Sequence, residues 1–387
     1  MFSNRTNWKL TRNRLTEALD EVRASGAHVL DLTLSNPTRA GLHYDEARIL
    51  CSLASPQAMD YDPQPKGLSA ARAAVVNYYE AEHRINVNPE RVILTTSTSE
   101  GYSFVFRLLC NPGDEVLVPK PSYPLFEFLA DLQDVKLVPY PLIYDHGWQM
   151  DLPSLRDAAT KRTRGVIVVH PNNPTGSYVQ AQERVALGDF CREHEIALIA
   201  DEVFLDYAHK GEPQPSFTGR PDALTFTLSG VSKISALPQM KVAWIVTSGP
   251  DRLVEAAQVR LEVIADTYLS MNAPIQWATP ELLDQRHRIQ RQLLERVLAN
   301  LAELDRQLAR QKACQRLSVE GGWYAVLRVP VTRTDEELAI DLLRRKLVLV
   351  HPGHFYDFPS DGYLVLSLIA QQADFAEALQ RILETNF

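Results

Sequence analysis

Three apolar runs in the middle of the sequence end in polar side chains that can take part in acid–base or covalent chemistry. VIVVH is followed by PNNPTG, ALIA by DEVF and LTFTL by SGVSK, which supply the amide of Asn173, the carboxylate of Asp201 and the amine of Lys233. Apolar runs without polar alternation suit parallel strands that are covered on both faces. Ligands of such sheets bind beyond the carboxyl ends of the strands. We therefore expect the three side chains at one rim of a sheet.

Each of these side chains has an ordinary explanation when it is taken alone. PNNPTG is a turn sequence, Asp201 and Glu202 can cap a helix, and most lysines are solvated. Together, an amine, a carboxylate and an amide match what pyridoxal phosphate requires of a protein. The amine forms a Schiff base with the aldehyde, the carboxylate keeps the pyridine nitrogen protonated, and the amide can hydrogen-bond the phenolic oxygen.

The elements that position these residues indicate an α/β fold. Strand-length apolar runs recur between helical stretches at Val92–Leu94, Val116–Val118, Val166–Val169, Ala197–Ala200, Leu224–Leu228 and Val242–Val246. They predict a mostly parallel, doubly wound sheet with helices on both faces.

The last hundred residues predict a second, smaller α+β domain. Apolar residues at helical spacing predict one long helix from Pro280 to Gln311, whose leucines we interpret as core rather than as a partner zipper. GGWYAVLRV, LVLVHPG and YLVLSLIA read as strands, and a helix closes the chain. The predicted division is 1–40, a helix and segment that contribute to the small domain and the substrate pocket; 41–279, the large cofactor-binding domain; and 280–387, the small domain.

The three motifs and their spacing resemble the fold-type I pyridoxal-phosphate enzymes of the class I/II aminotransferase family, over nearly the whole chain. The resemblance implies an enzyme that moves an amino group between an amino donor and an oxo acid. It implies that Lys233 holds the cofactor and then moves a proton between Cα and C4′ as general base and acid. Asp201 would face the pyridine nitrogen, and Asn173 the phenolic oxygen.

Further motifs resemble the family segments that contact the phosphate and the ring of the cofactor. Tyr61, in YDPQPKGLSAAR, stands where the family has a tyrosine that reaches the cofactor phosphate of the neighbouring subunit, which implies a homodimer with shared active sites. ILTTSTSEGY is similar to the phosphate loop, with backbone N–H groups of Thr98 and Ser99 and the Ser99 hydroxyl as donors. Tyr123, in NPGDEVLVPKPSYP, would stack on the pyridine ring, and Ser232 is a weaker phosphate candidate.

Two cofactor positions depart from the family pattern. Lys241 replaces an arginine that grips the phosphate through two hydrogen bonds; lysine keeps the charge but not the fork, so weaker cofactor retention is expected. Phe204 replaces the tyrosine of DEVY, which donates to the phenolic oxygen. Without that donor, the pKa of the Schiff base should rise.

The largest departure is Val365 in YLVLSLIA, where the family has the arginine that binds the substrate α-carboxylate. An aliphatic side chain cannot bind a carboxylate. Either the substrate lacks an α-carboxylate, or another cation binds it, or the alignment with the family slips at this point. A slip is disfavoured, because HPGHFYDFPSDGYLVLS carries the family's preceding Pro-Gly pattern in register. The candidate cations are Arg328, which could instead be solvated at a strand edge, and His351 and His354.

The N-terminal segment supplies two further substrate candidates. Ser35 and Asn36, in LTLSNPT, fall where the family's N-terminal segment lines the substrate pocket, and they could select a polar substrate through hydrogen bonds. SNPT is also an ordinary turn sequence.

Composition excludes several classes of protein. With 387 residues, 45% hydrophobic and 23% charged, the chain is typical of a globular protein, and a formal charge of -8 without a basic run argues against a nucleic-acid partner. Cys51, Cys110, Cys191 and Cys314 stand singly, which predicts neither a disulfide framework nor a metal site but buried thiols in a reducing cytoplasm. No run is long and apolar enough to span a membrane. The basic start MFSNRTNWKLTRNR resembles a mitochondrial presequence, but LTEALDEVRASG continues it as an amphipathic helix.

Other functions remain open at this point. A pyridoxal-phosphate decarboxylase, β-elimination lyase or racemase would use the same motifs, because the outcome depends on which Cα bond stands perpendicular to the ring. A non-catalytic cofactor-binding relative is a third hypothesis. The related transcription regulators carry a winged-helix domain for which this chain has no room. A Rossmann dehydrogenase is set aside, because no GxGxxG follows a strand.

Overall fold

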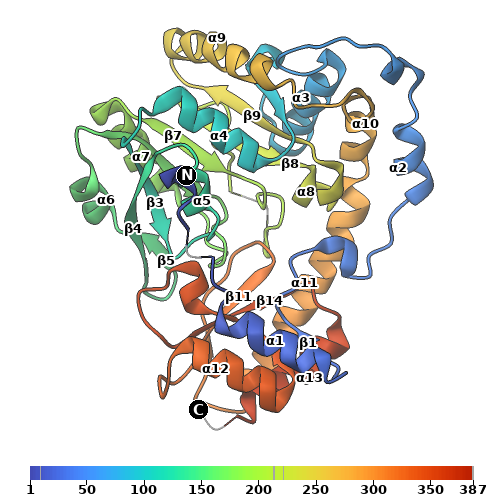
Figure 1. Ribbon diagram of the computed structural model, residues 1–387, viewed down its shortest axis with the longest axis vertical. Helices are drawn as coiled ribbons and strands as arrows, with labels where there is room; N and C mark the ends of the chain where they lie inside the picture. Colours follow the sequence, from blue (N-terminus) through green and yellow to red (C-terminus); the bar gives the residue numbers. More distant parts are fainter. Residues whose placement is uncertain (9, 212–213, 221, 386–387) are drawn as a thin grey trace.

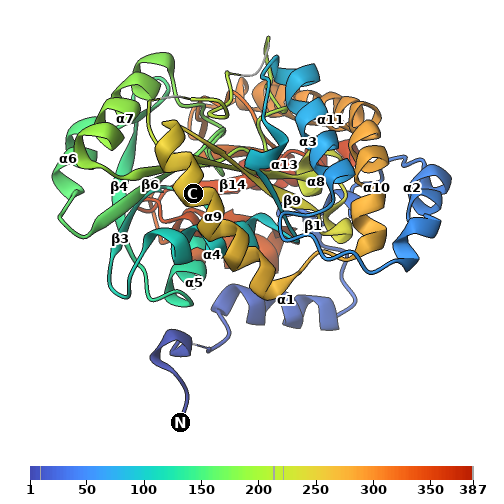
Figure 2. The same cartoon turned by 90° about the horizontal axis from the view of Figure 1, so that it is seen from above.

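The centre of the molecule is one large sheet, seen edge-on among its helices in Figures 1 and 2. The computed structural model describes residues 1–8, 10–211, 214–220 and 222–385. The sheet has the strand order β2-β9-β8-β7-β6-β3-β4-β5. Its strands are β2 (Val92–Thr95), β3 (Glu115–Lys120), β4 (Lys136–Tyr144), β5 (Trp148–Met150), β6 (Thr163–Val169), β7 (Ala197–Asp201), β8 (Thr225–Gly230) and β9 (Ala243–Ser248).

Most of this sheet is parallel, as the sequence predicts. The neighbours β8, β7, β6, β3 and β4 run parallel to one another. Strand β9 is antiparallel to both β8 and β2, and the short β5 is antiparallel to β4. All six apolar runs form strands. Strand β4 was not predicted, because Pro139 and Pro141 within it read as strand breakers.

Helices cover both faces of the sheet, because successive strand residues point to opposite faces. One face packs on α4 (Thr98–Leu109), α5 (Phe126–Asp131) and α9 (Asp251–Tyr268). The other packs on α3 (Ser69–His83), α6 (Leu152–Ala158), α7 (Ala181–His194) and α10 (Ala273–Asp284). The short helices α2 (Glu46–Ser52) and α8 (Val231–Ile234) lie at the end of the molecule near α10 in Figure 2.

The predicted helix from Pro280 to Gln311 is wrong in its bounds. Two helices occupy this region, α10 and α11 (Arg286–Leu308), and they are separated at Gln285. The Arg286 guanidinium donates to the Leu283 carbonyl at 2.8 Å, so a side chain satisfies a carbonyl at the break. Pro280 lies inside α10 rather than at its start. The apolar stripe of α11 is core, as predicted, with Ile289, Leu293, Val297 and Leu304 buried.

The C-terminal part packs with the N-terminal segment below the large sheet in Figure 1. A four-stranded antiparallel sheet has the order β10-β11-β14-β13, and β1 pairs with β12 in parallel. These strands are β1 (Leu30–Asp31), β10 (Gln315–Arg316), β11 (Tyr324–Arg328), β12 (Val348–Leu349), β13 (His351–Pro352) and β14 (Tyr363–Ser367). Helices α1 (Arg14–Ala24), α12 (Asp335–Asp341) and α13 (Gln372–Leu383) complete it.

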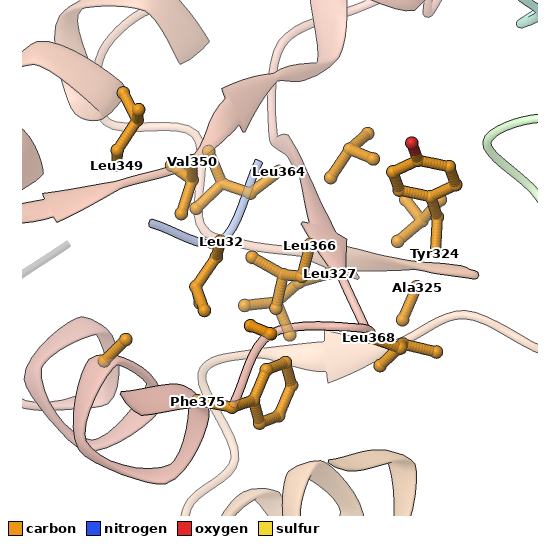
Figure 3. Close-up of a cluster of buried hydrophobic side chains, with 14 of the residues drawn as sticks. Leu32, Tyr324, Ala325, Leu327, Leu349, Val350, Leu364, Leu366, Leu368 and Phe375 are labelled. Carbon is orange, nitrogen blue, oxygen red and sulfur yellow. The ribbon is translucent and has the colours of Figure 1, made fainter. Parts of the chain in front are cut away.

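A shared apolar core joins these distant segments. Leu32 of the N-terminal segment packs among Leu327, Leu366 and Phe375, which come from β11, β14 and α13 (Figure 3). The predicted division at residues 40 and 279 remains a prediction. Helix α10 crosses the second boundary and packs on α3.

In the described part of the chain, no helix combines the length and apolarity needed to cross a membrane. The four cysteines form no disulfide. Cys191 and Cys314 are buried, but the expectation of a buried thiol is wrong for Cys51, which is exposed. Helix α2 buries Ile49 and leaves Cys51 on its outer side.

Candidate active site

The three chemical groups predicted from the sequence follow neighbouring parallel strands. Val169 of β6 is paired with Asp201 of β7, and Asp201 with Leu228 of β8. The three strands therefore end at the same rim, and Asn173, Asp201 and Lys233 follow them within a few residues.

Lys233 lies on α8, directly after the sharp exit from β8. Gly230 is required at this exit, because a Cβ there would lie 2.7 Å from the Val242 carbonyl oxygen and 2.9 Å from the Ala243 Cβ. The Lys233 Nζ lies 4.9 Å from the centre of the Trp323 ring and 5.5 Å from that of Phe204. Among the described residues, no carboxylate is within ion-pair distance of this amine. Burial lowers the pKa of Lys233 to about 8, against the opposing charge of Asp201.

Asp201 ends β7 and is buried. Tyr102 of α4 donates its hydroxyl to Asp201 Oδ2 at 3.1 Å, and the Val203 N–H donates to Oδ1 at 3.2 Å. Burial raises the pKa of Asp201 to about 6, although both donors and the charge of Lys233 favour its ionised form. The two hydrogen bonds therefore fix the orientation of the carboxylate, which can accept a proton or pair with a cationic group of a ligand.

The turn after β6 leaves one amide oxygen without a partner. Asn172 is used by the fold, because its side chain donates to the Pro121 carbonyl at 3.1 Å and to the Thr175 hydroxyl at 2.9 Å. The Oδ1 of Asn173 is one of several buried side-chain atoms that have no hydrogen-bond partner among the described residues. The Asn173 amide is therefore available to a ligand at this rim, where its Nδ2 can donate and its Oδ1 can accept a hydrogen bond.

The first turn of α4 has the form of an anion site. Ser97 caps the helix by accepting from the Glu100 N–H at 3.2 Å, and Glu100 accepts from the Thr96 N–H at 2.7 Å. The backbone N–H groups of Thr98 and Ser99, in the first turn, have no carbonyl partner within the helix. Such donors, with the positive end of the helix dipole, suit a phosphate group.

The remaining predicted cofactor residues differ in exposure. Tyr123 follows β3, is 41% exposed, and has a pKa that is raised by burial and by the charge of Asp201. Ser232 is partly buried on α8, and Lys241 is exposed with a φ of 54°. Tyr61 is 85% exposed. It lines a cavity of about 450 Å³ with Ser270, whose hydroxyl donates to Glu100 at 2.6 Å.

The structure brings only some of the predicted substrate residues toward this rim. Ser35 hydrogen-bonds Tyr324, whose ring centre lies 6.4 Å from that of Phe204. Asn36 instead caps a short 3-10 helix by accepting from the Thr38 N–H at 3.1 Å, so the turn interpretation holds for it. In Figure 3 the Tyr324 hydroxyl points away from Phe375 and the apolar core.

The predicted cations are placed less favourably. Arg328 is exposed at the end of β11 and donates to the side chain of Gln315. This position agrees with the alternative given above, in which Arg328 is solvated at a strand edge. His354 is also exposed and packs edge-on against Phe355. Of the three, only His351 is partly buried; it lies on the edge strand β13, opposite Val365.

Several residues of this site were missed by sequence reasoning. Tyr102 holds Asp201, and Trp323 packs against Lys233. Burial raises the pKa of both Tyr324 and Tyr356, and the nearby hydroxyl of Tyr123 adds to the rise in each. The aromatic pairs in GGWY and HFY were visible, but strands of a core are usually aromatic-rich, so nothing in the pattern distinguished them.

These residues fit pyridoxal phosphate. An amine of lowered pKa, a buried carboxylate on the neighbouring strand, an unpaired amide and a helix N-terminus lie at one rim of an α/β sheet. Among the described residues, no cluster of His, Cys, Asp and Glu could hold a metal ion. The fold and the site together define a pyridoxal-phosphate-dependent enzyme of fold type I.

Comparison with known proteins identifies the family. The model of aminotransferase class I and II matches residues 45–382. An alanine aminotransferase of Mycobacterium tuberculosis is 27% identical over 369 residues, which cover 93% of this chain and 86% of that relative. A glutamate-pyruvate aminotransferase of Escherichia coli is 30% identical over 269 residues, 69% of this chain and 66% of that relative. The solved alanine aminotransferase of Pyrococcus furiosus has the same fold, with a TM-score of 0.90 at 22% identity over 98% of each chain.

The chain therefore belongs to the class I and II aminotransferase family. It is a pyridoxal-phosphate-dependent transferase.

Proposed function

We propose that this protein is an aminotransferase that moves an amino group from an amino donor to an oxo acid through a cofactor held by Lys233. The observation that carries the proposal is the Lys233 amine, which has a pKa of about 8 and no ion-pair partner among the described residues, beside the buried Asp201. A lysine in this state is available both as a nucleophile and as a base near neutral pH.

The roles of the other residues follow from their positions. Asp201 would keep the pyridine nitrogen protonated, Asn173 would donate to the phenolic oxygen, and Tyr123 would cover the ring. Thr98, Ser99, Ser232 and Lys241 would bind the phosphate. When bound, pyridoxal phosphate withdraws electrons from the Cα of the donor. Lys233 would be the base that takes the Cα proton of the donor and the acid that returns it to C4′.

The names of the relatives suggest where to look for substrates. They are called alanine aminotransferase and glutamate-pyruvate aminotransferase, so alanine, glutamate and their oxo acids are the first compounds to test. The unpaired cysteines suit a reducing compartment, and we place the activity in the cytoplasm.

Product analysis tests transamination against the alternative chemistries. The cofactor-loaded protein is incubated with each amino donor and an oxo acid, and the new amino acid, the new oxo acid and carbon dioxide are measured. Equal amounts of the two transfer products support the proposal. Carbon dioxide or ammonia without transfer would mean a decarboxylase or a lyase, and no product with any donor would favour the non-catalytic reading.

Phe204→Tyr should lower the pKa of the linkage between Lys233 and the cofactor. Phe204 packs at the site, with its ring centre 5.5 Å from the Lys233 Nζ, but it offers no hydrogen bond to the phenolic oxygen. A hydroxyl there would stabilise the phenolate and so favour loss of the linkage proton, by about one pKa unit. The visible spectrum followed against pH measures it, and an unchanged titration would contradict the role given to position 204.

We also propose that the enzyme is a homodimer in which Tyr61 serves the site of the partner. The support is its 85% exposed aromatic side chain and its place in the 450 Å³ cavity, which is also lined by Ser270, the hydrogen-bond partner of Glu100 in the first turn of α4. An exposed tyrosine without a hydrogen-bond partner among the described residues suits an interface between subunits.

Mixed dimers test this shared site. Tyr61→Ala and Lys233→Ala should each be weakly active alone, but mixed dimers should contain one site with both native residues. Roughly a quarter of the native activity should return when the two variants are combined in equal amounts, because half of random dimers are mixed and each has one intact site. No recovery, with mixed dimers present on a native mass spectrum, would place Tyr61 in the site of its own chain.

A further inference from the structure

Three polar side chains of the small antiparallel sheet and the segment that follows β13 lie together near the cofactor site. Tyr324 pairs with Ser367 across β11 and β14, and His351 pairs with Val365 across β13 and β14. Residues directly opposite each other, and residues two apart on one strand, share a face of a sheet. Tyr324, His351 and Val365 therefore share one face.

Tyr356 joins this face through its hydroxyl. Its Oη is 3.1 Å from the Nδ1 of His351, and its pKa is raised by burial, with contributions from Tyr324 and Tyr123. Its backbone carbonyl accepts from the Ser122 N–H at 3.0 Å, which fixes it beside Tyr123. We call Tyr324, Tyr356 and His351 the neutral cluster.

Phe204 is a near neighbour of both the cluster and the reacting amine. The ring of Phe204 lies 5.5 Å from the Lys233 Nζ, and its centre is 6.4 Å from that of Tyr324. The Tyr324 and Tyr356 side chains are 6% and 5% exposed, so the hydroxyls are largely shielded from water. A group of the substrate attached to the reacting carbon would meet this cluster.

No positive charge is held against the cluster in the described part of the chain. Burial lowers the pKa of His351, so its imidazole is neutral at pH 7, and the charge that acts on it is that of Asp31. Asp201 acts on the neighbouring Tyr123 and not on a member of the cluster. Lys120 is ion-paired with Asp357 at 3.0 Å. Arg333 apart, the hydrogen bonds and ion pairs of the described arginines and lysines do not include any residue of the cluster.

We propose that the neutral cluster binds an uncharged polar group of the amino donor, either a carboxamide on the carbon that bears the amine or a hydroxyl on the carbon after it. This inference rests on the proposed aminotransferase function and names its substrate class. Two tyrosine hydroxyls and an imidazole can each donate and accept, which suits a group that does both. A carboxylate at the cluster would be desolvated near the charge of Asp31 and without a paired cation, which is strongly unfavourable.

A pair of unreactive ligands tests the proposal on the cofactor-loaded enzyme. 2-Methylalanine and its carboxamide have the same size and no hydrogen on the reacting carbon, so proton removal does not follow binding. Calorimetry should find that the carboxamide binds at least about tenfold more tightly, since an unpaired buried charge costs more than one hydrogen bond. Equal binding, or tighter binding of the carboxylate, would overturn the proposal.

Three variants locate the effect. Tyr356→Phe should weaken binding of the carboxamide about five- to tenfold and leave that of the carboxylate nearly unchanged. Val365→Arg should reverse the preference by supplying the missing cation. Tyr144→Phe is the control, because it removes a hydroxyl that accepts from the Ser318 N–H outside the cluster. A loss of carboxamide binding in Tyr144→Phe equal to that in Tyr356→Phe would count against the assignment.

Amino-group transfer from L-alanine and from L-alaninamide separates this proposal from the proposed function. Faster transfer from L-alaninamide supports both. If L-alanine transfers its amino group faster, the enzyme is an aminotransferase but the neutral cluster has been misread. If neither compound, nor any other donor tested, transfers its amino group, the proposed function is wrong and this inference falls with it.

Discussion

Lys233→Ala is expected to abolish amino-group transfer, with a loss of at least about a thousandfold in kcat/KM. The variant would lose both the proposed covalent attachment of the cofactor and the base for the Cα proton. The Lys233 amine is the group at this rim with the lowered pKa, and neither of the neighbouring Trp323 and Phe204 side chains can replace it as a nucleophile. The same variant should lose the visible absorption of the lysine-bound cofactor.

Conservative and distant lysine variants make this result specific. Lys233→Arg keeps a positive charge but cannot form the linkage, so it should be as inactive as Lys233→Ala. Lys346→Ala, on the far side of the small domain, should retain native activity. Substantial activity in Lys233→Arg would mean that the charge, and not covalent chemistry, is what the reaction needs.

Asp201→Asn should reduce kcat/KM by about a hundred- to a thousandfold and yet stabilise the cofactor-free protein. Activity falls because an amide does not hold the pyridine nitrogen in its protonated form. Stability rises because the folded protein buries a carboxylate whose pKa is about 6, whereas the same group in the unfolded chain has a pKa of 3.8. The ionised carboxylate costs the fold up to about 3 kcal/mol at neutral pH, and asparagine removes this cost.

The stability cost of the ionised Asp201 carboxylate depends on pH, which gives a second test. Because the folded-state pKa is raised, the cost is fully present above pH 6 and disappears as the pH falls toward 4, so the native protein should approach the stability of Asp201→Asn over that range. Thermal melting of both cofactor-free proteins between pH 4 and pH 8 measures the difference, expected to be a few degrees at pH 8. A variant that melts lower than the native protein at pH 8 would show that the carboxylate supports the fold.

The central sheet and its rim could be predicted because their signals are local. Each buried strand is an unbroken apolar run, and the polar residues after β6, β7 and β8 break the pattern where a sheet of this kind binds its ligand. Once the motifs indicated the family, the roles proposed for Lys233, Asp201 and Asn173 followed from the resemblance.

The environment of these residues could not be predicted, because it depends on contacts between distant segments. Tyr102 reaches Asp201 across 99 residues of sequence, and the neutral cluster needs the registers of β11, β13 and β14. The break at Gln285 depends on a side chain that satisfies a carbonyl, which the apolar repeat does not record. The antiparallel orientation of β9 between β8 and β2 is likewise a property of the topology rather than of any single apolar run.

The most direct test of the account is a single-turnover titration of the purified, cofactor-loaded enzyme, followed by its visible spectrum. Amino donors are added one at a time, first alanine and glutamate and then their carboxamides and amino alcohols, and the oxo product is counted against enzyme sites. The account predicts that at least one donor converts the lysine-bound cofactor to its amine form with one oxo product per site, and that an oxo acid reverses the change. A lysine-bound spectrum that no donor alters would contradict it.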